Sequence, residues 1–104
     1  MIGRETIEFS GEVWTWTVGN EGRPVTWYLV TAVGEPAAEI RVATLGLTGG
    51  FGSVRVRATV GRTSWTTSIF PDGKTDGWML PLKAEIRKRE NIIQGDQLTV
   101  YLDF

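Results

Sequence analysis

Glycines, serines and cations in the middle and second half of the chain are the residues best suited to bind a ligand. A glycine-rich loop can present backbone N–H groups to an anion, and lysine or arginine can pair with its charge. We therefore expect a site for a small anionic ligand at one mouth of the fold. Its predicted residues are Gly50, Phe51, Gly52, Ser53, Ser68, Lys83 and Arg87.

Catalysis is the weaker interpretation of the same residues. Ser68 and Lys83 would act as a Ser–Lys pair only if the lysine were desolvated and within hydrogen-bond reach of the serine, and nothing in their spacing demands this. The chain has no cysteine and no histidine, which removes thiolate ligands and the commonest general base near neutral pH. We predict a non-enzymatic binding domain with no catalytic residue, no cofactor and no metal.

Nucleic-acid binding is the alternative function. The cations that could form a basic patch are Arg55, Arg57, Arg87, Lys88 and Arg89. The net charge of −1 argues against a dominant attraction to phosphates, and Glu85 and Glu90 flank the basic run. A small anionic ligand or a protein partner is therefore the first expectation.

Alternation of apolar and polar residues predicts strands along most of the chain. Residues 54–60 place valine and alanine on one face, and the two-residue turn beginning at Gly61 suits a type II′ hairpin. Both faces of residues 25–33 are apolar, which predicts a strand buried on both sides. Pro36 begins one short helix, and residues 83–91 favour another. The sequence thus predicts an all-β (mainly β) barrel with two short capping helices.

The two halves of the chain share an internal repeat. A pair of tryptophans 13 residues apart recurs at an offset of 51, and an Ala-Glu-Ile-Arg segment recurs at an offset of 46. The tryptophans are Trp14, Trp27, Trp65 and Trp78, and the segments are 38–41 and 84–87. We infer a duplicated half-barrel in which each copy covers the open sheet edge of the other. These four tryptophans are then expected in the core, and Trp16 is expected to be exposed.

Longer motifs resemble a known family. They are Gly50–Val54, Trp65–Pro71, Leu80–Lys83, Gly95-Asp96 and, upstream, Trp14, Trp16 and Trp27–Val30. Together they are similar to the family described as domain of unknown function nineteen-oh-five, over nearly the whole chain. The resemblance implies a double-split β-barrel, distantly AbrB- and MazE-like. It implies no activity. In AbrB-like folds a basic dimer surface meets DNA, which is where the alternative function would reside.

Length and composition also indicate the number of domains, the location and the oligomeric state. The 104 residues predict a single β-barrel domain over 1–104, with an ordinary globular balance of 41% hydrophobic and 22% charged residues. No apolar run approaches the roughly 20 residues needed to cross a bilayer. We expect a cytoplasmic protein with no membrane contact, present as a monomer or a homodimer.

Overall fold

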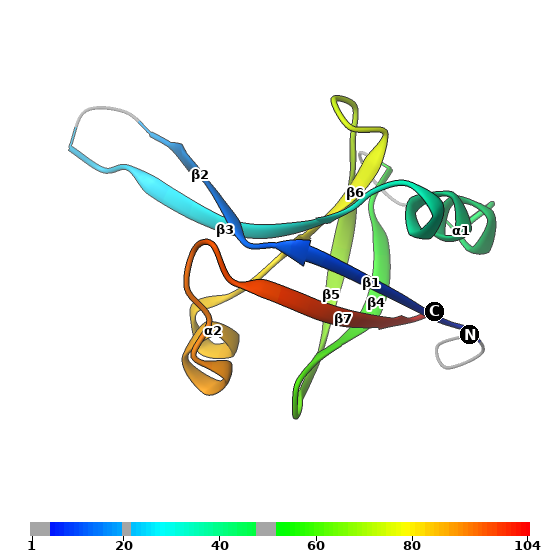
Figure 1. The fold of residues 1–104 in the computed structure, drawn as a ribbon. Coiled ribbons are helices and arrows are strands. Elements are labelled where there is room, and N and C mark those ends of the chain that lie inside the picture. The colour runs from blue at the N-terminus through cyan, green and yellow to red at the C-terminus, as the bar shows by residue number, and fades with distance from the viewer. Residues whose placement is uncertain (1–4, 20–21, 48–51) are drawn as a thin grey trace.

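The computed structural model describes residues 5–19, 22–47 and 52–104. Within them the chain is mainly β, with two short helices, as expected (Figure 1). The elements are β1 (Thr6–Glu12), β2 (Trp14–Val18), β3 (Val25–Ala32), α1 (Glu35–Ala43), β4 (Val54–Val60), β5 (Thr63–Asp72), β6 (Gly77–Pro81), α2 (Ala84–Glu90) and β7 (Gln97–Asp103).

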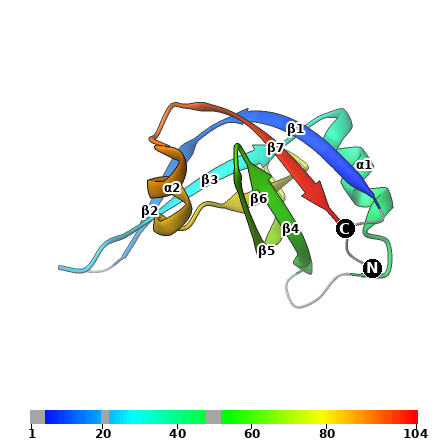
Figure 2. The ribbon, with the colours of Figure 1, turned by 90° about the horizontal axis from the view of Figure 1, so that it is seen from below.

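The described strands form one antiparallel, curled half-barrel sheet in the order β1-β7-β4-β5-β6-β3-β2 (Figures 1 and 2). Only Val13 separates β1 from β2, yet β1 pairs with β7 and β2 pairs with β3 at the other end of the order. β5 is divided similarly, since residues 63–69 pair with β4 and residues 70–72 pair with β6. We call β1, β7, β4 and residues 63–69 the first half-sheet. The second half-sheet is residues 70–72, β6, β3 and β2.

The core lies between the inner faces of the two half-sheets. The predicted alternation in β4 is confirmed, because Val54, Val56, Ala58 and Val60 are all buried. Ile40 of α1 and Ile86 of α2 are buried in the same cluster. Each helix therefore contributes apolar surface to the core.

The predicted turn between β4 and β5 is confirmed. Gly61 has a φ of 58°, and its neighbours Val60 and Thr63 are directly paired. A positive φ at the first of two turn residues is the requirement of a type II′ turn, and glycine meets it without strain.

The expectation that the strand over residues 25–33 is buried on both sides is wrong for its first half. Val25 and Trp27 are 54% and 46% exposed, so Trp27 is also not the core residue expected from the repeat. This half of β3 pairs with β2 alone, whereas residues 29–32 pair with β6, and only Leu29 pairs with both strands. Of the other tryptophans expected in the core, Trp78 is buried, while Trp14 and Trp65 are half-buried.

Candidate ligand-binding face

The outer faces of the two half-sheets differ in chemistry. That of the first half-sheet is polar and includes Glu8, Ser10, Arg55, Arg57, Thr66, Ser68 and Thr99. That of the second half-sheet is largely apolar and includes Trp14, Trp16, Trp27, Leu29, Phe70, Met79 and Pro81. We call these seven residues the aromatic face. Large apolar patches on a protein surface are characteristic of binding sites.

Strand register brings the aromatic face together, because directly paired residues share one face of a sheet. Trp16 of β2 lies opposite Trp27 of β3, and Trp14 lies opposite Leu29. Pro81 of β6 then pairs with Leu29 on its other side. In the next row, Met79 pairs with both Thr31 and Phe70. Residues up to 67 positions apart in the sequence, Trp14 and Pro81, are thereby collected on four neighbouring strand segments.

The aromatic face is hollowed. A hollow of about 260 Å³, which we call the apolar hollow, is lined by Trp16, Trp27, Leu29, Phe70, Met79 and Pro81. Trp16 is 55% exposed and Phe70 is 37% exposed, so their rings are accessible to solvent. A hollow of about 540 Å³ adjoins it through Trp16 and Met79, and extends to the turn between β5 and β6. The Trp14 indole N–H donates to Thr31 Oγ1 over 2.8 Å in the wall of this second hollow.

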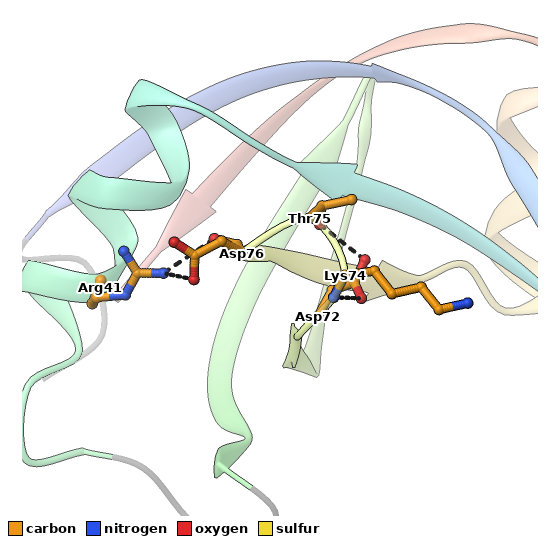
Figure 3. Close-up of polar contacts among 5 residues, drawn as sticks. All are labelled: Arg41, Asp72, Lys74, Thr75 and Asp76. Carbon is orange, nitrogen blue, oxygen red and sulfur yellow. Dashed lines mark hydrogen bonds and ion pairs between the residues drawn. The ribbon is translucent and has the colours of Figure 1, made fainter.

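The turn between β5 and β6 is fixed by its own hydrogen bonds (Figure 3). The Asp72 carboxylate accepts from the Lys74 backbone N–H at 3.1 Å and from Thr75 Oγ1 at 2.9 Å. Arg41 of α1 forms an ion pair with Asp76 at 3.0 Å, which ties the turn to that helix. The Lys74 side chain extends away from the Asp72 carboxylate in Figure 3, so its ammonium group is directed to solvent.

Two cations lie beside the aromatic face, on the side of α2. Lys83 and Arg87 line a hollow of about 210 Å³, which we call the basic hollow, together with Val25, Thr26, Trp27, Tyr28, Pro81 and Leu82. It shares Trp27 and Pro81 with the apolar hollow, so the two are neighbours. None of its lining residues is acidic.

Arg87 is held in a defined orientation within the basic hollow. Its Nε donates to the Leu82 carbonyl over 3.1 Å, and its guanidinium carbon lies 3.8 Å from the centroid of the Tyr28 ring. The guanidinium group is planar, and contact with an aromatic ring limits its orientation, which suits bidentate pairing with a carboxylate or phosphate.

The site residues predicted from the sequence fall into separate places. Gly50 and Phe51 lie outside the described residues. Gly52 lies near Pro71, since a Cβ on it would be 3.2 Å from Pro71 Cγ, and Ser53 leads directly into β4. Ser68 is on the outer face of the first half-sheet, where its Oγ accepts from Arg55 over 3.4 Å. Only Lys83 and Arg87, of those described, line one hollow together.

The cations predicted to form a nucleic-acid-binding patch lie on two separate elements, β4 and α2. Arg55 and Arg57 lie on the outer face of β4, and Arg89 pairs with Glu85 at 3.3 Å. A shallow hollow of about 710 Å³ includes Arg87 and Lys88, but its lining comes from the single segment 84–93. Its walls are therefore one helix and the turn that follows.

The aromatic face is the feature that the sequence predictions missed. They named Trp16 as the exposed tryptophan but assigned Trp14 and Trp27 to the core. The available signal was the Trp-Thr-Trp-Thr-Val order of residues 14–18, which separates large apolar residues from threonines by strict alternation. Such a strand has one apolar and one polar face, and a neighbouring strand with Trp27 must extend the apolar one.

These observations define a small, mainly β domain that carries an aromatic face and an adjoining pair of cations. The chain belongs to the family described as "Domain of unknown function (DUF1905)", which matches residues 9–102. The resemblance noted from its motifs is thus confirmed at the level of the family. No curated protein matches the sequence significantly.

Proposed function

We propose that this chain is a non-enzymatic binding domain for a small molecule that has a flat apolar ring and an anionic group. The ring would lie in the apolar hollow of the aromatic face, and the anionic group would pair with Arg87 and Lys83 in the basic hollow. The observation that carries the proposal is the contrast between the polar outer face of one half-sheet and the aromatic outer face of the other.

The volume and the lining of the apolar hollow indicate which ring the proposed ligand would carry. The hollow's volume of about 260 Å³ lies just below the range of drug-sized pockets, so it suits one or two fused rings. The indoles of Trp16 and Trp27 are directly paired across β2 and β3 and are accessible. Aromatic rings in contact favour offset or edge-to-face packing, which stabilises a flat apolar ligand more than a branched one.

The two cations of the basic hollow indicate that the ligand carries an anionic group. Arg87 is oriented by Leu82 and Tyr28, and among the described residues neither Arg87 nor Lys83 forms an ion pair with a carboxylate. Pairing with a ligand anion would therefore displace no carboxylate among the described residues. Trp27 and Pro81 border both hollows, and the proposed ligand would extend past them to Arg87, which contacts Tyr28 on the opposite face of β3.

A Ser–Lys enzyme has less support. Ser68 lies on the polar outer face beside Arg55, and it is not among the described residues that line the basic hollow with Lys83. Nucleic-acid binding stays the alternative proposal, tested by salt-dependent retention on DNA and its loss when Arg55 and Arg57 are neutralised. A cytoplasmic location also stays a proposal, supported by the absence of cysteine.

The finer architecture belongs with these proposals. We infer that the curled sheet is a double-split barrel built by duplication, with β1 and β2 together equivalent to β5. The support is the pairing pattern, since β1 pairs with β7 as β5 pairs with β4, and β2 pairs with β3 as β5 pairs with β6. The two copies then meet through the β3–β6 and β4–β7 pairs.

The test of ligand binding is a titration with 2-naphthoate followed by tryptophan fluorescence. Trp27→Thr removes a wall of both hollows and should abolish measurable binding. The matched control is Tyr101→Thr, which removes a comparably exposed ring (41% against 46%) from the first half-sheet and should bind like the wild type. Equal binding by the two variants would reject the aromatic face as the site.

A further inference from the structure

β2 is an edge strand without the charged residues or proline that usually protect sheet edges. Among the described residues its backbone pairs with β3 alone, so the N–H and C=O groups along its other side have no strand partner. Native sheets usually protect such edges with charged side chains, proline or a bulge. β1, at the other end of the strand order, carries Glu8 and Glu12, whereas β2 consists only of tryptophan, threonine and valine.

The part of β3 that pairs with β2 is uncharged as well. We call residues 14–18 of β2 and residues 25–28 of β3 the arm. No residue of the arm is charged, and the net charge of the whole chain is −1. The free end of the arm extends beyond the rest of the sheet in both views (Figures 1 and 2). The arm itself therefore carries no charge that would repel a second copy of the same strand.

We propose that β2 is a dimerisation strand, to which β2 of a second copy of this chain adds in antiparallel orientation. A two-fold axis at Trp16 places the two Trp16 residues opposite each other, Trp14 opposite Val18, and Thr15 opposite Thr17. In this register the tryptophans and valines of both strands lie on the side of the sheet that carries the aromatic face, and the threonines lie on the other side. It is self-complementary, as a closed two-fold interface requires.

The dimer joins two half-barrels into one continuous sheet and brings the aromatic faces of both copies side by side. The basic hollow lies beyond β3, on the side of the arm away from the β2 edge, and stays open. Trp16 lies at the proposed axis and also lines the apolar hollow, so dimerisation and ligand binding share this one side chain.

Sedimentation velocity of the full chain tests the proposal. The wild type should shift from monomer to dimer as its concentration rises, because mass action favours the associated state. T15K/T17K places like charges opposite each other across the axis and should weaken the dimer at least about tenfold. T15E/T17K places opposite charges there and should restore it. The matched control S64K/T66K, on the outer face of β5, should dimerise like the wild type.

Amide hydrogen exchange on the wild type gives a second readout that needs no variant. Protection of the amides in residues 14–18 should rise with protein concentration. A monomer at every concentration would overturn the proposal, as would a dimer that forms without added protection of β2 or one that is unaffected by T15K/T17K. An extended peptide from another protein as the sole β2 partner would appear as a wild-type monomer.

Discussion

A substitution at Arg87 tests how much of the binding affinity comes from the charge of the proposed ligand and how much from its shape. Substitution of Arg87 by glutamine removes the charge and the guanidinium group while retaining a polar, though shorter, side chain. We expect R87Q to weaken binding of 2-naphthoate and to leave binding of the neutral 2-naphthamide nearly unchanged.

The size of the effect follows from the contacts of Arg87. A hydrogen bond to a charged partner contributes about 1.5–3 kcal/mol, and every 1.4 kcal/mol is about a tenfold change in affinity, so the loss for 2-naphthoate should be roughly 10- to 100-fold. Removing the Nε hydrogen bond to Leu82 and the contact with the Tyr28 ring should lower the free energy of unfolding by only about 1–2 kcal/mol. The variant therefore stays folded.

Isothermal titration calorimetry with the two ligands, on the wild type, R87Q and K74Q, provides the comparison. Lys74 is the matched control, because it is a cation near the aromatic face but outside the basic hollow. Our reasoning is refuted if R87Q weakens the acid and the amide equally, or if K74Q has the larger effect on the acid.

Three stability predictions test the fold itself, each by urea unfolding. Gly77→Ala should lower the free energy of unfolding by about 3 kcal/mol, because a Cβ there would lie 2.2 Å from the Ala32 carbonyl oxygen; a loss under about 1 kcal/mol contradicts this close approach. Glu90→Ala should cost about 1.5 kcal/mol, since its carboxylate accepts from Thr63 Oγ1 at 2.6 Å; an unchanged midpoint would disprove the bond. Asn91, which ends α2 with a φ of 54°, should tolerate glycine but lose about 1 kcal/mol with alanine, and the reverse order would rule out the left-handed cap.

Local features of the fold could be predicted from the sequence because they depend on neighbouring residues. The buried face of β4 and the turn at Gly61 follow from alternation and from the conformational freedom of glycine. Lys83 and Arg87 were placed in one candidate site, and their spacing of four at the start of a helix keeps them close.

Long-range features could not be predicted in the same way. Alternation shows that Trp27 and Tyr28 point to opposite faces, but it does not show whether another element covers either face. Trp27 is exposed because β6 pairs with β3 only from Leu29 onward, and that register depends on residues about 50 positions away. The position of Ser68 beside Arg55 likewise follows from the β4–β5 register, which the composition of either strand leaves open.

The most direct measurement of the central claim is a two-dimensional ¹⁵N–¹H NMR spectrum of the wild type recorded during addition of 2-naphthoate. We predict that the indole N–H signals of Trp16 and Trp27 shift together with the side-chain signal of Arg87, while the signal of the buried Trp78 stays in place. Shifts concentrated at Arg55 and Ser68, on the other half-sheet, would contradict the assignment of the aromatic face as the ligand site.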